Sequence, residues 1–171
     1  MRRCRPFVPI TVPSRASSPP DVAPTDESPA EGATASWEHF SHDADIGLVG
    51  IGPTKAEAFR QAALALTAVV TDPALVRSVT AVSVVCRAGS DEILLVDWLN
   101  ALVYEMAVRS ILFGEFNVEI ADGELRATAW GELVDQGRHE PAVEVKGATL
   151  TALRVAPVAG GGWRAQCVVD V

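Results

Sequence analysis

The sequence has few of the residues that build disulfide frameworks, zinc sites and nucleotide-binding loops. It contains three cysteines and three histidines in 171 residues, and no pair of cysteines shows CxxC spacing. An odd cysteine count without such spacing argues against a disulfide framework and against a zinc site. Neither a GxxxxGK[ST] phosphate-binding loop nor a GxSxG nucleophile elbow occurs. The cysteine usage fits a reducing compartment, so we expect a cytoplasmic protein in which Cys86 and Cys167 are small buried hydrophobic residues.

Long apolar runs and an excess of basic residues are also missing. No run approaches the roughly 18 apolar residues that a membrane span needs, so we expect no membrane association. The formal net charge is -8, and residues 1–35 hold equal numbers of acidic and basic side chains, so the negative charge lies on the remainder. Phosphate contacts supply most nucleic-acid affinity, and we therefore expect no strong direct binding of nucleic acid. A role in RNA chemistry would instead involve docking on a basic protein.

Residues 1–35 differ in composition from the rest of the chain. The prolines of this segment are Pro6, Pro9, Pro13, Pro19, Pro20, Pro24 and Pro29. Such a composition cannot bury enough apolar surface to offset its ordering entropy. We therefore expect 1–35 to be a disordered tail and 36–171 to be one folded domain. The early arginines resemble a targeting signal, but Pro9 interrupts the apolar stretch that a secretion signal needs, which favours an unstructured extension or a start codon placed too early.

Within 36–171, hydrophobic periodicity and turn residues predict an α+β domain. One helix begins after Thr54, which forms a capping box with Glu57, and ends at Thr71-Asp72 before a proline. A second helix begins after Ser90 and runs to about Ser110. The predicted strands are 37–42, 46–51, 79–87, 116–120, 125–132, 143–155 and 163–171. Asp122-Gly123 predicts a two-residue hairpin between the fourth and fifth of them, and residues 135–140 form a polar turn. The order β-β-α-β-α-β-β-β-β predicts two helices packed on a mostly antiparallel sheet.

The last predicted strand carries candidate functional groups. Its residues alternate, with Trp163, Cys167 and Val171 on one face, which predicts that the final residue lies on the sheet with its α-carboxylate held in place. Asp170 is one residue away and points to the more polar face. Two fixed carboxylates this close repel each other, so they require a proton, a basic partner or a hard cation such as Ca²⁺ or Mg²⁺.

A second acidic group lies far upstream, between the first two predicted strands. The run is Ser41-His42-Asp43-Ala44-Asp45-Ile46-Gly47. Asp45 is either a cation ligand or an Asx residue that caps a turn. His42 either takes part in ligand binding or acid–base chemistry, or it hydrogen-bonds its own loop. Asp43 joins Asp45 on one side only if the connection stays extended.

Several runs of residues, taken in order, resemble the archease family. The resemblance covers 37–171, and the segment 1–35 lies outside it. The helix at 54–72 resembles a family helix, and six shorter motifs carry the rest of the likeness. These motifs are Phe40-Ser41-His42-Asp43-Ala44-Asp45-Ile46-Gly47, Asp97-Trp98-Leu99-Asn100-Ala101-Leu102-Val103-Tyr104, Gly131-Glu132, Arg138-His139-Glu140, Glu144-Val145-Lys146-Gly147-Ala148-Thr149 and Asp170-Val171.

The resemblance implies a non-catalytic accessory protein of the GTP-dependent, RtcB-type RNA ligase of tRNA splicing and RNA repair. Such proteins promote guanylylation and multiple turnover of the ligase, and they bind a divalent cation. Calcium is the expected ion, with magnesium or manganese as alternatives. The family's metal ligands map onto Asp45, Asp170 and the main-chain carboxylate of Val171.

Two departures from the family pattern leave roles open. The family has an acid before the histidine, where this chain has Ser41, and a threonine after it, where this chain has Asp43. Asp43 and His42 are therefore candidates for metal binding or for supporting the ligands. Two further candidates for partner contact are His139, which could instead solvate a loop, and Lys146, which could instead form a salt bridge with Glu144. Glu132 is expected either to approach the metal site or to cap a strand.

Two other functions remain compatible with the residues. Carboxylates around a cation can activate water, so a stand-alone metal-dependent phosphodiesterase is the alternative from the enzyme class. A metal-stabilised, chaperone-like module is the other. An accessory factor would be inert alone, whereas a nuclease would cleave RNA without a partner.

Overall fold

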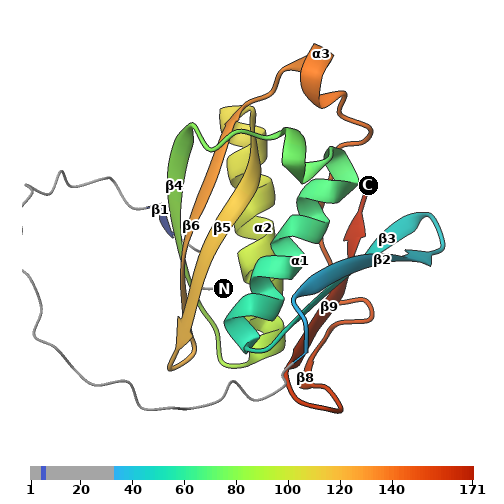
Figure 1. Ribbon diagram of the computed structural model, residues 1–171, viewed down its shortest axis with the longest axis vertical. Coiled ribbons are helices and arrows are strands. Elements are labelled where there is room, and N and C mark those ends of the chain that lie inside the picture. Colours follow the sequence, from blue (N-terminus) through green and yellow to red (C-terminus); the bar gives the residue numbers. More distant parts are fainter. Residues whose placement is uncertain (1–4, 7–32) are drawn as a thin grey trace, which may run out of the picture.

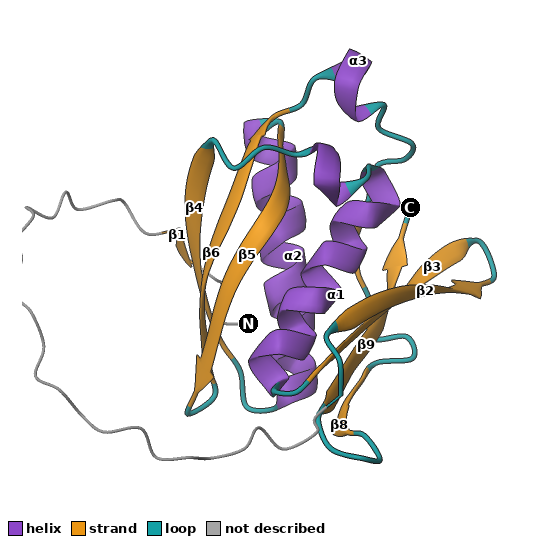
Figure 2. Ribbon diagram, in the orientation of Figure 1, coloured by secondary structure: helices purple, strands orange, loops and turns teal. Residues whose placement is uncertain are grey.

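The computed structural model describes residues 5–6 and 33–171 of the chain (Figure 1). Two antiparallel sheets enclose a layer that contains the two long helices (Figure 2). The largest side chains of the core are fully buried in this layer and against it, and they include Trp98, Phe59, Phe113 and Leu48. None of the helices within the described ranges is long and apolar enough to cross a membrane.

The first sheet has the strand order β1-β4-β6-β5. Its strands are β1 (Arg5–Pro6), β4 (Thr80–Arg87), β5 (Ile111–Ala121) and β6 (Glu124–Leu133). Strands β5 and β6 form a hairpin in which Asp122 and Gly123 have φ angles of 50° and 72°. Two successive positive φ angles are typical of the tight turn that an Asp-Gly pair favours, so the predicted two-residue hairpin is confirmed.

The second sheet has the order β2-β3-β9-β7, and β8 also pairs with β9. Its strands are β2 (Ser36–His42), β3 (Asp45–Gly52), β7 (Gly147–Ala148), β8 (Arg154–Pro157) and β9 (Trp163–Asp170). Helix α1 (Lys55–Val70) packs directly on β3, because Gly50 leaves room for its backbone. A Cβ atom at Gly50 would lie 2.1 Å from the carbonyl oxygen of Ala58.

The caps of both long helices are as predicted. The Thr54 side chain accepts a hydrogen bond from the Glu57 N–H, and α1 ends at Thr71. The Ser90 side chain accepts one from the Ile93 N–H at the start of α2 (Asp91–Arg109). The described residues also form two short helical turns, η1 (Pro73–Leu75) and α3 (Gln136–His139). The turn predicted at 135–140 is confirmed by α3.

The α+β class and the element order are confirmed, but the strands are shared between two sheets. Helix α1 explains this division, because residues on most of its circumference are buried, including Ala58, Phe59, Ala62 and Leu66. A helix buried on opposite sides needs cover on both. The predicted strand 143–155 is two short strands, β7 and the start of β8, separated by a turn in which Ala152 has a φ of 50°.

Strand β1 lies inside the predicted tail and pairs with β4 through Arg5↔Val85 and Pro6↔Val84. The prediction that 1–35 is disordered otherwise falls mainly on residues outside the described ranges.

Candidate functional site

The register of the second sheet brings Asp45 and Asp170 to neighbouring positions. Asp45 is the first residue of β3 and Asp170 the last of β9. Ile46 pairs with Val169, so one further step of the same antiparallel register sets Asp45 opposite Asp170. Side chains at opposite positions share a face of the sheet, with Cβ atoms roughly 4.5–5.5 Å apart. Two carboxylates that are more than 120 residues apart in the sequence therefore meet at one edge of the fold.

Asp45 and Asp170 form an acidic row across β3 and β9, and this row continues onto β2. His42 pairs with Asp45 across the turn that joins β2 to β3, so His42, Asp45 and Asp170 lie side by side on three adjacent strands. Neighbouring strands are about 4.8 Å apart, so His42 lies beside Asp45 and roughly twice that distance from Asp170. Asp43 is in the turn itself with a φ of 52°, and its side chain is exposed. The extended connection that would align Asp43 with Asp45 is thus absent, because the chain reverses there within two residues.

Lys146 holds the last two residues of the chain. Its backbone N–H donates to the Asp170 carbonyl oxygen at 2.8 Å. Its Nζ donates to the main-chain oxygen of Val171 at 2.9 Å. The repulsion between carboxylates at this strand end requires a proton, a basic partner or a hard cation. The structure supplies a basic partner, the Lys146 ammonium group. In the described part of the chain Lys146 forms no salt bridge with Glu144, and its ammonium group contacts the terminal residue instead.

Glu132 and His139 belong to a buried cluster on β6 and α3. The Glu132 carboxylate accepts hydrogen bonds from Arg138 Nη1 at 2.6 Å and from the backbone N–H of Arg77 at 2.8 Å. Arg77 Nε donates to its other oxygen at 3.0 Å. These bonds, first from Arg138 and then from Arg77, hold the pKa of the Glu132 carboxyl far below its ordinary range. Glu132 is thus matched by cations of the protein, and this cluster explains it without a metal.

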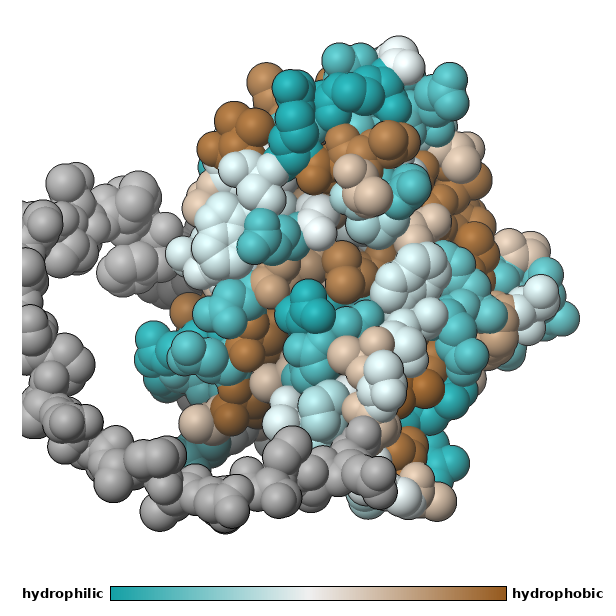
Figure 3. All heavy atoms as spheres, viewed as in Figure 1, coloured by the Kyte–Doolittle hydropathy of each residue, from teal (hydrophilic) through white to brown (hydrophobic). Residues whose placement is uncertain are grey.

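His139 lies in the interior beside Glu132. Its side chain is 0% exposed, and its Nε2 is 3.3 Å from a Glu132 oxygen. Nδ1 accepts the Asp135 N–H at 2.9 Å, so Nε2 carries the proton that faces Glu132. The ring is therefore enclosed and does not solvate a loop, and a contact of His139 with a partner stays a prediction. Figure 3 shows the hydrophilic surface that covers this end of the molecule, around α3.

The sequence did not single out Asn100, which positions the strand next to Lys146. Its side chain donates to the Ala148 carbonyl oxygen at 3.1 Å and accepts the Ala148 N–H at 2.8 Å. The amide therefore bonds β7 as a neighbouring strand would. The position of Asn100 between the apolar residues Leu99 and Ala101 of α2 was the available signal.

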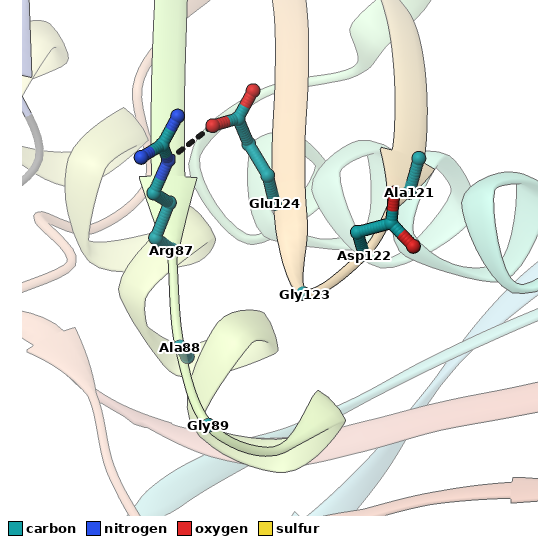
Figure 4. A pocket seen from close by; sticks show the side chains of 7 residues that line it. All are labelled: Arg87, Ala88, Gly89, Ala121, Asp122, Gly123 and Glu124. Carbon is teal, nitrogen blue, oxygen red and sulfur yellow. Dashed lines mark hydrogen bonds and ion pairs between the residues drawn. The ribbon is translucent and has the colours of Figure 1, made fainter.

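A hollow of about 590 Å³ lies at the turn between β5 and β6 (Figure 4). Arg87 and Glu124 form an ion pair at its edge, and Arg126 also pairs with Glu124. The arginines there are thus already matched by Glu124.

The carboxylates of Asp45 and Asp170 fit a hard divalent cation if the terminal carboxylate of Val171 joins them. Carboxylate oxygens are the ligands that Ca²⁺ and Mg²⁺ prefer. Within 5–6 and 33–171, however, no group of three or more His, Cys, Asp or Glu side chains is arranged to hold a metal ion. Asp45 and Asp170 therefore need the terminal carboxylate of Val171 to form a set of three.

Comparison with known proteins places this fold among small α+β proteins of one family. The model of the archease protein family (MTH1598/TM1083) matches residues 37–171. Protein archease of Pyrococcus furiosus is 37% identical over 139 residues, which are 79% of this chain and 98% of that protein. Protein archease of Methanosarcina acetivorans is 38% identical over 140 residues, 79% of this chain and 95% of that protein. The chain belongs to the archease family.

Solved structures agree with this assignment. The solution structure of Methanobacterium thermoautotrophicum protein 1598 is 31% identical, with a TM-score of 0.70 over 80% of this chain and 99% of that one. A Thermotoga maritima archease, described as a possible chaperone, is 14% identical with a TM-score of 0.51 and shares the fold.

Proposed function

We propose that this protein is a metal-binding accessory factor that activates a GTP-dependent, RtcB-type RNA ligase in tRNA splicing or RNA repair. The observation that carries the proposal is the family match over the whole folded domain, residues 37–171. The acids at the end of β9 support it, because the register of β3 and β9 sets Asp45 and Asp170 opposite each other, and neither carboxylate pairs with an arginine within residues 33–171.

Asp45, Asp170 and the Val171 carboxylate would hold the cation, with calcium as the first choice and magnesium or manganese as alternatives. A bound divalent cation would supply positive charge at a pole that otherwise concentrates negative charge. The strands β3 and β9 fix two of these groups, and the third belongs to Val171, directly after the end of β9. His42 would orient Asp45 from the adjacent strand, and Asp43 would remain in the exposed turn.

The partner is proposed to be the ligase. It would dock on the acidic pole, the end of the domain that carries Asp45, Asp170 and the Val171 carboxylate. The formal charge of -8 opposes direct binding to RNA and favours a basic protein surface. The protein would raise the ligase rate by positioning the ligase nucleophile and GTP, without forming a covalent intermediate itself. Lys146 is exposed at the same pole and is the side chain placed to meet an anionic group of the complex.

The direct test is guanylylation of the cognate ligase by GTP, with this protein added below stoichiometric amounts. We expect a faster reaction and multiple turnover with the wild type. RNA cleavage by the protein alone would contradict the proposal and support the phosphodiesterase. Protection of unrelated unfolded proteins, without any effect on the ligase, would support the chaperone-like module.

Asp45→Ala is predicted to weaken divalent-cation binding by about tenfold or more, because it removes one of few hard ligands. The fold should persist, since Asp45 is only half-buried at a strand end. Glu119→Ala, on an exposed position of β5, is the matched control for loss of one negative charge. Calorimetric titration with CaCl₂ measures the change, and an unchanged affinity in the Asp45 variant would exclude Asp45 as a ligand.

A further inference from the structure

Lys146 occupies an unusual electrostatic position for one of only two lysines in the sequence. Its Nζ lies 2.9 Å from the main-chain oxygen of Val171. Its own backbone N–H is bonded to Asp170, so the side chain originates beside the end of β9. Asp170 precedes Val171 in the chain, and Asp45 lies opposite Asp170 in the register of β3 and β9. The ammonium group is therefore held at the terminal residue, next to the strand end that carries these acids.

We propose that Lys146 is a built-in counter-cation, which takes the place of the divalent cation at the Val171 carboxylate when no metal is bound. The inference rests on the metal binding proposed above. In the metal-free protein the ammonium group neutralises part of the acidic row. A divalent cation that binds Val171 must compete with this ammonium group, and its binding releases Lys146 toward solvent.

The exposure of the contact makes the exchange physically accessible. Lys146 and Asp170 are exposed, and Val171 is half-buried, so water screens the interaction between the ammonium group and the carboxylate. Exposed ion pairs of this kind stabilise a fold little, and a flexible lysine stem allows the head group to leave without moving the backbone. The backbone bond between Lys146 and Asp170 would remain in place and keep the released side chain near the site.

Lys55 provides a control within the same chain. It forms a 2.6 Å ion pair with Asp91 and lies over the ring of Trp163, at the opposite end of β9 from Asp170. Replacing either lysine by methionine changes the net charge equally and keeps most of the aliphatic stem. Only the replacement at Lys146 removes a positive charge that lies beside the acidic row.

The experiment is calorimetric titration of the full-length wild type, Lys146→Met, Lys55→Met and Lys146→Arg with CaCl₂ at low ionic strength. Removing a unit charge next to a divalent ion is expected to tighten calcium binding by about threefold to thirtyfold in Lys146→Met. Lys55→Met and Lys146→Arg should bind as the wild type does. Equal or weaker binding by Lys146→Met, with normal binding by the wild type, would overturn the inference and leave the metal function standing.

A second measurement follows the release of Lys146 directly. The wild type is labelled with an amine-reactive ester with and without saturating CaCl₂, and mass spectrometry compares modification of Lys146 with that of Lys55. We expect calcium to increase the labelling of Lys146 severalfold relative to Lys55. An unchanged ratio at saturation would overturn the release. Absence of calcium binding in all four proteins would overturn the proposed metal function itself, and with it this inference.

Discussion

Single carboxylates serve two different purposes in this protein, and their surroundings decide which. Glu132 is buried among donors, with Arg138 and Arg77 each within hydrogen-bonding distance. Asp170 is exposed, and its neighbour across the sheet is another acid. The first arrangement stabilises the charge within the protein, and the second leaves the charge exposed to solvent. The sequence shows an acidic residue in both cases and cannot distinguish them.

The lowered pKa of Glu132 predicts how the stability of the fold depends on pH. Because this pKa is depressed below its ordinary value of 4.5 in the folded state, the carboxylate stabilises the fold above that pH. Its contribution is lost as the pH falls toward the lowered folded value. Glu132→Gln should therefore lower the melting temperature by several degrees at neutral pH, and the difference from the wild type should shrink in acid. Thermal unfolding from neutral pH to pH 3 measures this, with Glu119→Gln as the exposed control.

Among the elements, the contact of α1 with β3 depends on a single glycine. A Cβ at Gly50 would lie 2.1 Å from Ala58 O and 2.4 Å from Ala62 N, both backbone atoms that cannot rotate away. Gly50→Ala should therefore destabilise the protein by about 1–3 kcal/mol or more, through overpacking between the sheet and the helix. Gly89→Ala is the matched control, because a Cβ there meets nothing within 4 Å. Urea unfolding decides the matter, and equal stability of the two variants would contradict this account of the packing.

The elements also show what the sequence can predict. Thr54, Ser90 and Asp122-Gly123 act within a few residues, and the helix starts and the hairpin predicted from them are confirmed. The division into two sheets depends on contacts between distant segments, which periodicity does not record. The burial of His139 likewise depends on two residues distant in the sequence: its Nε2 faces Glu132, and its carbonyl oxygen accepts a hydrogen bond from Thr71 Oγ1.

The candidate site was predicted in part for the same reason. The alternation in the last strand indicated that Asp170 is held on a sheet, and the family resemblance connected it with Asp45. The register of β3 against β9 supplies the physical link between them, and no local pattern contains it. The bond from Lys146 to Val171 was equally invisible, since 25 residues separate the two.

For the molecule as a whole, the described fold runs continuously from residue 33, close to β2, and only the two-residue strand β1 precedes it. Ala33 donates a backbone hydrogen bond to Gly161 at 3.1 Å, so residues 33–171 include this contact. Removal of residues 1–32 should leave the melting temperature within a few degrees of the wild type and preserve ligase activation, because the family match starts at residue 37. Calorimetry and the guanylylation assay test this. A loss of activation by a stable truncated protein would show that the removed segment takes part in docking.

The central claim is that the acidic pole binds a divalent cation through the end of the chain. Adding residues after Val171 converts its carboxylate into an amide and removes one full negative charge from the row. The account predicts that such an extension weakens calcium binding and ligase activation as strongly as Asp170→Ala does, whereas the same residues added before Met1 leave both unchanged. A folded, C-terminally extended protein with wild-type calcium affinity, measured by calorimetric titration, would contradict it.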